Sequence, residues 1–186
     1  DRQVNQAYQR LDALFQVGQK FVEATDENEV IEAVLRLSVE LATAKGASFV
    51  PLDDHSQPMA ATTYGDLPPS VVDPWLEYLA SPNVRDRCRA CEHHEHLNEA
   101  CPLLKGPIGE ASGIYCLPLR RAEREFGVLN IFLQPAAEMD RDTRAFLSAL
   151  GDVTALALEG VRLRRREIAT LRQMQSIRQK TDQQAL

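Results

Sequence analysis

The residues best able to do chemistry in this sequence are four cysteines, which all lie between positions 88 and 116. Cys88 and Cys91 form a Cys-Arg-Ala-Cys pair. Two intervening residues let both sulfurs face one centre, while backbone N–H groups between them hydrogen-bond to the thiolates. Cys101 follows in the same segment. Four cysteines are too few for a disulfide framework in a chain of this size, so their crowding indicates metal or redox chemistry in a reducing compartment.

The fourth cysteine, Cys116, lies in a β-prone run over residues 113–119. Alternation along a strand predicts two faces, which are Ile114, Cys116 and Pro118 on one side and Tyr115, Leu117 and Leu119 on the other. If the leucine face packs on helices, the Cys116 sulfur points into a pocket on the opposite face. There it would complete a ligand set that descends from the preceding segment and would tie a metal centre to the sheet.

The spacing of the four cysteines bears on the kind of centre they hold. One Cys-x-x-Cys pair with two well-separated single cysteines is a spacing common around cubane iron–sulfur clusters, whereas structural zinc sites usually show two close pairs. A 4Fe–4S cluster held by Cys88, Cys91, Cys101 and Cys116 is therefore the favoured prediction. A zinc site, a thiol–disulfide switch and cysteines that share no site remain open as alternatives.

Other side chains in the same segment are less informative. Three histidines, His93, His94 and His96, could replace cysteine at zinc or at Rieske-type iron, but a solvated polar loop fits them better, and none is included in the predicted ligand set. Three arginines surround the first cysteine pair and would favour thiolates, or simply belong to an exposed loop; they are Arg85, Arg87 and Arg89. There is no ordered Cys–His–acid arrangement and no glycine-rich phosphate loop, so we do not expect an enzyme.

Composition predicts one globular domain with helical extensions. The chain has 186 residues, 44% of them apolar, and a net charge of −6. The acidic balance gives no reason to expect nucleic acid or an anionic membrane surface as a partner. No run of about 18 apolar residues is present, so we expect no membrane contact by this chain. The reducing compartment that the cysteines indicate is best matched by a bacterial cytoplasm. The start at Asp1 rather than Met suggests a piece of a longer protein.

Two helices are expected before the first strand. The first has an apolar seam at alternating spacings of four and three, formed by Val4, Tyr8, Leu11, Phe15, Gly18 and Val22. Asp26 and Glu29 form a plausible capping box for the second helix, which we expect to end at Gly46. A long helix from Asp140 to about Lys180 is expected to close the chain. It contains the charge run Arg162 to Arg166, which is typical of a solvated helix face rather than of a site for an acidic partner.

Between these helices the sequence predicts two hairpins. The first pairs residues 47–52 with 58–64, and the second pairs 113–119 with 126–133. A short helix carrying Val71, Trp75 and Leu79 and then an irregular loop over 83–111 would separate the hairpins. All four histidines lie at 55 and 93–96, outside the long helices where a phospho-acceptor histidine would be expected, which indicates an input module rather than a kinase.

The phrases Leu117-Pro118-Leu119-Arg120 and Gly127-Val128-Leu129-Asn130 resemble the closing hairpin of GAF domains. The resemblance extends over roughly residues 11–160. It implies an α+β fold with a central antiparallel sheet of about five to six strands, helices on one face, a ligand pocket on the other, and flanking signalling helices that dimerise. The implied divisions are a helix at 1–24, the sensory domain at 25–160 with its cysteine-rich loop at 83–111, and a connector helix at 161–186.

The chain departs from two specialised groups of that family. It lacks the Asn-Lys-Phe-x-Asp-Glu signature of cyclic-nucleotide GAF domains, and Glu92 rather than His follows Cys91, unlike in bilin-binding members. It is most similar to the cysteine-cluster GAF modules of nitrate/nitrite-type and redox-type sensor kinases. This similarity implies an iron–sulfur sensory input domain of a bacterial sensor histidine kinase, responding to redox state or to a gas such as O2 or NO.

Two further interpretations of the same resemblance stay open. One is a GAF domain with a structural zinc site, and the other is a small-molecule-binding or dimerising module whose cysteines are incidental. In each case the expected partners are a second copy of the chain, paired through the terminal helices, and a downstream kinase or other output domain.

Overall fold

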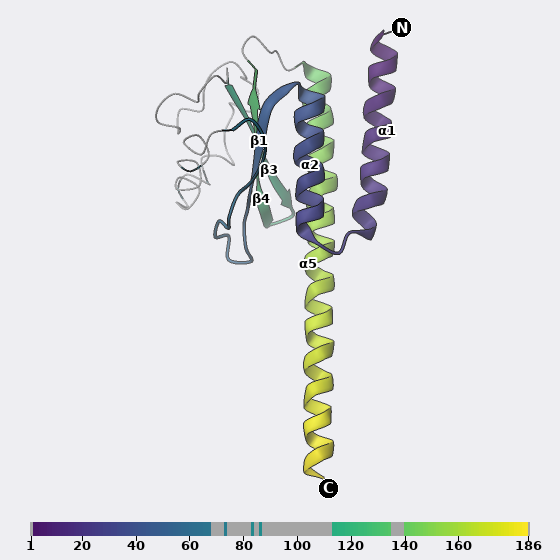
Figure 1. Cartoon of the computed structure of the whole chain (residues 1–186), viewed down its shortest axis with the longest axis vertical. Helices are drawn as coiled ribbons and strands as arrows, with labels where there is room; N and C mark the ends of the chain where they lie inside the picture. Colours follow the sequence, from purple (N-terminus) through teal and green to yellow (C-terminus); the bar gives the residue numbers. More distant parts are fainter. Residues whose placement is uncertain are drawn as a thin grey trace.

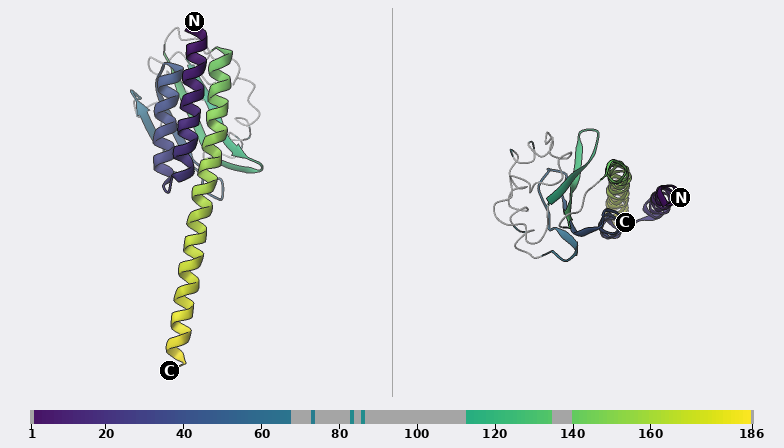
Figure 2. Two further views of the ribbon diagram at one scale, coloured as in Figure 1. Left: turned by 90° about the vertical axis from the view of Figure 1, so that its right-hand side faces the viewer. Right: turned by 90° about the horizontal axis from the view of Figure 1, so that it is seen from above.

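The computed structural model describes residues 2–67, 113–134 and 140–185, together with Asp73, Asn83 and Asp86. In chain order its elements are α1 (Arg2–Glu23), α2 (Glu27–Ala42), β1 (Ala44–Pro51), β2 (Thr62–Gly65), β3 (Gly113–Arg121), β4 (Arg124–Leu133) and α5 (Arg141–Gln184). Figures 1 and 2 show three layers, in which α2 and α5 cover one face of the sheet and α1 lies over these two helices.

The sheet is antiparallel, and its described strands follow the order β2-β1-β4-β3. The two hairpins, β1–β2 and β3–β4, are joined by pairing between β1 and β4 at the centre. The expected α+β fold with an antiparallel sheet and helices on one face is confirmed. Four strands lie within the described residues, where about five to six were expected for the whole domain.

The helix-facing side of the sheet and the inner sides of α2 and α5 form one apolar core. Phe49 of β1, Leu129 of β4 and Leu158 of α5 are all fully buried in it. Gly127 is required where β4 meets β1, because a Cβ at this position would lie 2.6 Å from the Val50 carbonyl oxygen and would overlap the Phe49 ring. The glycine in the Gly-Val-Leu phrase therefore has a packing reason.

The helix α2 begins as expected, but its end differs from the prediction. Asp26 caps it by accepting a hydrogen bond from the backbone N–H of Asn28 at 3.1 Å. The helix ends at Ala42, where Thr43 adopts a left-handed conformation with φ of 50°. Gly46, the expected end of the helix, instead lies inside β1. A glycine is needed there because a Cβ would lie 2.9 Å from the Tyr64 carbonyl oxygen. A glycine needed for close strand approach was thus mistaken for a helix stop.

The segment between β1 and β2 also differs in detail. The second strand begins at Thr62 rather than at residue 58, because Pro58 has no N–H to continue a ladder and makes only an isolated bridge with Leu52. The helix expected around Val71, Trp75 and Leu79 lies outside the described residues, although Asp73 is helical.

Part of the expected loop at 83–111 is helical. Asn83 and Asp86 adopt helical conformation, and the remainder of the segment lies outside the described residues. The expectation of an irregular loop is therefore wrong at these two positions.

The outer helix α1 packs on the rest of the domain through a different face from the apolar seam that the sequence predicts. Val17 and Phe21 are buried against the other helices, whereas the predicted seam faces outward. Its members Val4, Tyr8, Leu11, Phe15 and Val22 are all exposed, and nothing lies near Gly18. The seam therefore has no partner within the described part of the chain.

The last helix, α5, runs for 44 residues, as the long apolar-then-polar pattern predicts. Its buried side chains stop at Val161, and every residue from Leu163 to Ala185 is exposed. The C-terminal half projects beyond the rest of the molecule (Figure 1). Among the described helices, none combines the length and apolar character that crossing a bilayer requires.

Candidate functional site

Cys116 lies on β3 with its side chain on the sheet face that points away from the helices. It packs beside Ile114, Phe132 and Leu67, whereas the neighbouring Leu117 and Leu119 belong to the helix-facing core. The alternation predicted for this strand is therefore confirmed. The other predicted ligands, Cys88, Cys91 and Cys101, lie outside the described residues, as do the histidines and arginines between 85 and 96.

A polar row crosses the sheet at the level of Cys116. In register, Cys116 pairs with Asn130, Asn130 with Ser48, and Ser48 with Thr63, so one polar residue from each strand lies on the same face. Ser48 and Asn130 are completely buried. The Asn130 amide Nδ2 donates to Ser48 Oγ at 3.4 Å, but Asn130 Oδ1 has no hydrogen-bond partner among the residues that the structure describes. A buried unpaired acceptor is uncommon in folded proteins and calls for an explanation.

The opposite side of β3 contacts α5 directly. A Cβ at Gly151 of α5 would lie 2.8 Å from Leu117 Cδ2 and 3.1 Å from Leu119 Cδ2, so the glycine allows the helix to rest on this strand. Cys116 is flanked by Leu117 in sequence. A displacement of the Cys116 sulfur would therefore be felt at Gly151 through a single residue of a closely packed strand.

The surroundings of Cys116 suit a thiolate-bound centre. The face carries apolar residues, among them Val128 and Phe132 on β4, and such a shell limits the access of water to a metal. Within the described ranges, no three Cys, His, Asp or Glu side chains come together as a metal site. A centre at Cys116 would therefore need ligands from beyond the described residues, as the predicted set of four cysteines does.

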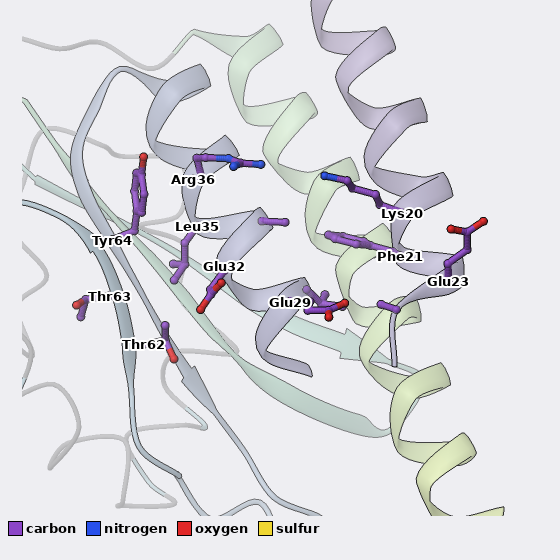
Figure 3. A pocket seen from close by; sticks show the side chains of 13 residues that line it. Lys20, Phe21, Glu23, Glu29, Glu32, Leu35, Arg36, Thr62, Thr63 and Tyr64 are labelled. Atoms are coloured by element: carbon purple, nitrogen blue, oxygen red, sulfur yellow. The ribbon is translucent and has the colours of Figure 1, made fainter. Parts of the chain in front are cut away.

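A separate groove of about 710 Å³ lies on the helical side of the molecule, between α1, α2 and β2 (Figure 3). Lys20 of α1 and Arg36 of α2 extend toward each other across it, and Phe21 and Leu35 form part of its apolar wall. Its rim also carries three glutamates, Glu23, Glu29 and Glu32. The groove separates α1 from α2, so that α1 rests mainly on α5. It contains none of the predicted site residues.

A second charged feature was misjudged from the sequence. The run from Arg162 to Arg166 is not merely a solvated helix face, because four of its arginines bind groups elsewhere in the chain; we call Arg162, Arg164, Arg165 and Arg166 the arginine collar. Their partners are Glu27, the Ala24 carbonyl oxygen, Asp26 and Asp54, respectively. These partners lie more than a hundred residues away in sequence, so no local charge pattern could have identified them.

Comparisons with known proteins agree with this architecture. The family model described as the GAF domain matches residues 24–159. The GAF domain of a protein from Pseudomonas syringae pv. tomato has a TM-score of 0.60 at 20% identity, covering 91% of this chain and 97% of that one. The GAF domain of the potassium sensor histidine kinase KdpD from Escherichia coli has a TM-score of 0.55 at 14% identity, covering 84% and 97%.

An enzyme is also among the similar structures. Free methionine-R-sulfoxide reductase from Neisseria meningitidis has a TM-score of 0.54 at 15% identity, covering 83% of this chain and 90% of that one. At such identities the likeness concerns the fold alone. A search of curated proteins found no match.

The antiparallel sheet with helices on one face, together with these structural similarities, defines a GAF-like α+β domain. The family match extends over most of the chain. The chain belongs to the GAF domain family.

Proposed function

We propose that this chain is the sensory input domain of a bacterial signal-transduction protein, in the simplest case a cytoplasmic sensor histidine kinase. The proposal is supported by the family match and by the projecting α5, whose exposed half is suited to connect the sheet to an output domain. Within the chain, the signal would be received on the sheet face that carries Cys116 and passed through β3 to α5.

We further propose that Cys88, Cys91, Cys101 and Cys116 hold a 4Fe–4S cluster, as in cysteine-cluster modules of redox-type sensor kinases. The observation that carries this proposal is the position of Cys116 on a rigid strand, facing away from the helices. When bound, such a cluster would supply a centre that changes redox state or reacts with O2 or NO. A structural zinc ion on the same cysteines is the alternative metal centre.

The chain's own residues provide the route from this face to the output. Cys116 would fix its strand to the centre, while Leu117 and Leu119 lie on the far side of the same strand, against Gly151. Because this interface is closely packed, a shift of β3 must move α5 or be resisted by it. Paired α1 and α5 helices in a homodimer would carry the movement to the output domain.

The decisive experiment is anaerobic purification of the whole chain, followed by visible absorbance and by analysis for iron, sulfide and zinc. The cluster proposal predicts coloured protein containing iron and sulfide, with colour lost on exposure to air. Cys116→Ser should lose the centre, whereas Ser48→Ala, a change on the same face that removes no proposed ligand, should keep it. Colourless protein with zinc would support the structural site, and colourless metal-free protein would contradict both metal proposals.

A second candidate function is favoured by the unpaired Asn130 Oδ1. A small molecule with an N–H or O–H group, bound against this face, would satisfy the buried acceptor. This candidate predicts metal-free protein from which a co-purified compound is released on denaturation and identified by mass spectrometry. Replacing Asn130 with leucine should abolish that retention, whereas loss of the Cys116 thiol should leave it intact.

A further inference from the structure

The arginine collar lies where α5 leaves the rest of the molecule, and the proposed sensory function does not account for it. Three connecting segments meet α5 at this level: the α1–α2 turn at 24–26, the β1–β2 loop at 53–57, and the end of the β3–β4 hairpin at 121–124. Figure 1 shows these segments together at the end of the sheet from which α5 projects. The collar therefore joins every layer of the fold to the output helix.

The inner part of the collar is a buried anchor. Arg162 Nε lies 2.6 Å from Glu27 Oε1, and the two side chains are only 10% and 13% exposed. The Arg162 guanidinium also lies over the Phe126 ring, 5.3 Å from its centroid, and Arg164 Nη2 donates to the Ala24 carbonyl oxygen at 2.6 Å. Breaking a buried ion pair leaves an uncompensated charge, so this contact persists whenever the domain is folded.

The outer part of the collar lies one helical turn further along α5 and consists of exposed rather than buried ion pairs. Asp54 accepts from Arg166 at 2.6 Å and from Arg124 at 3.1 Å, and all three side chains are between 37% and 51% exposed. Exposed ion pairs contribute little stability, so they can break and re-form without unfolding the domain. Arg166 is also the last residue of α5 that any described interaction ties to the sheet or its loops.

The loop that carries Asp54 is itself well fixed to the sheet. Asp53 Oδ1 accepts from the backbone N–H groups of His55 at 2.8 Å and Gln57 at 2.9 Å, which closes the turn. The hydrogen bond from the Gln57 backbone N–H, and after it the one from His55, lower the pKa of Asp53 below its ordinary value of 3.8. The loop directly continues β1, the strand that contributes Ser48 to the polar row. A movement of β1 would therefore also move Asp54, because the turn between them is held by hydrogen bonds.

We propose that Asp54 is a releasable latch on the output helix, with Arg162–Glu27 as its permanent anchor. When Asp54 binds Arg166, α5 is held to the sheet as far as Arg166. When it releases Arg166, the collar holds α5 only to α2 and the α1–α2 turn, through Arg162 with Glu27, Arg164 with the Ala24 carbonyl oxygen and Arg165 with Asp26, and no longer to the β1–β2 loop. The latch depends only on described contacts and is independent of which ligand the sheet binds.

Hydrogen exchange of the whole chain, followed by mass spectrometry, tests this latch. Asp54→Asn keeps the size of the side chain but removes its charge, and amides at 163–170 should then exchange about two- to fivefold faster. Arg166→Gln should produce the same change without altering the loop. The matched control is Glu159→Gln, which removes another exposed pair on α5, with Arg121 at 3.3 Å, and should leave 163–170 unchanged.

Two additional comparisons make the test strict. High salt should accelerate exchange at 163–170 more in the wild-type chain than in Asp54→Asn, because the variant lacks the Asp54–Arg166 pair and keeps only the exposed Arg165–Asp26 pair. The double variant Asp54→Asn/Arg166→Gln should exchange no faster than either single variant. Wild-type exchange in both single variants, additive acceleration in the double variant, or equal acceleration by Glu159→Gln would each overturn the proposal. Unchanged exchange in the buried part of α5, around Leu150, confirms that every variant is folded.

Discussion

At the scale of single residues, Asp140 determines how the output helix begins. Its Oδ1 accepts a hydrogen bond from the backbone N–H of Thr143 at 2.7 Å, which caps α5. The Thr143 hydroxyl in turn accepts from Arg10 Nη2 at 2.7 Å, so the cap is connected to α1. Hydrogen bonds from the Thr143 side chain and then from its backbone N–H lower the pKa of Asp140 below its ordinary value of 3.8.

We expect Asp140→Ala to lower the free energy of unfolding by about 1 kcal/mol at pH 7, because a capping side chain is lost. Asp140→Asn should lose much less, because asparagine caps equally well. Since the folded-state pKa of Asp140 is depressed, its ionic contribution is complete above pH 3.8 and is lost as the pH falls below that value. Urea unfolding at pH 7 and pH 3 checks both points. Equal destabilisation by alanine and asparagine would show that the cap is not responsible.

Residue-level properties that depend on local periodicity were predictable from the sequence. The side of β3 on which Cys116 lies follows from two-residue alternation, and the capping role of Asp26 follows from its place before an apolar stripe. The unpaired acceptor of Asn130 could not be predicted, because it depends on which side chains from β1 and β3 become its neighbours. The same holds for Asp54, whose partners Arg124 and Arg166 come from distant elements.

At the scale of elements, two glycines in α5 have different roles. Gly151 is buried against β3, and a Cβ there would lie 2.8 Å from Leu117 Cδ2. Gly160 faces only the guanidinium of Arg164, with Nη1 at 3.3 Å from an added Cβ, so an alanine there requires a shift of a few tenths of an ångström in a side chain that also binds the Ala24 carbonyl oxygen. Both positions gain helix propensity on replacement with alanine, so a comparison between them isolates the effect of contact with the sheet.

We expect Gly160→Ala to raise the free energy of unfolding by about 0.5–1 kcal/mol, as alanine favours the helix. Gly151→Ala should instead lower it by roughly 1–2 kcal/mol, because overpacking against Leu117 and Leu119 outweighs that gain. Urea denaturation of the two variants checks the difference in sign. A stabilised Gly151→Ala variant would mean that β3 yields easily, which would weaken the proposed route from Cys116 to α5.

The elements themselves were largely predictable, because strong periodicity and caps mark both helical ends of the chain. The residues at which these elements begin and end were less predictable. Gly46 was read as a helix stop because glycine serves equally at helix ends and at close strand contacts, and only the approach of Tyr64 distinguishes the two roles. Thr43, which follows the last residue of α2, has a positive φ that its neighbours in the sequence do not predict.

At the scale of the whole molecule, α1 forms the outermost layer (Figure 2), and the side chains of its apolar seam are exposed. Sequence periodicity identified this seam but not its direction, since any helix with two apolar faces can pack through either. The inner face, with Val17 and Phe21, packs within the domain, which leaves the seam available to another chain. The exposed part of α5 carries further apolar residues, namely Leu163, Ile168, Leu171, Met174 and Ile177.

Our proposal that two copies pair through these helices makes a specific prediction for Phe15, which lies near the middle of the seam and is 66% exposed. A symmetric dimer would bury this position in both copies, so Phe15→Glu would place two charges in the interface. It should therefore weaken dimerisation about a hundredfold or more. Gln9→Glu adds the same charge on α1 at an exposed position outside the seam and should leave dimerisation unchanged. Sedimentation analysis of the full chain measures both. A wild-type chain that is monomeric at all concentrations tested, or a Phe15→Glu variant that dimerises normally, would exclude pairing through α1. If the wild-type chain is monomeric, the helices must transmit any signal from the sheet within a single chain.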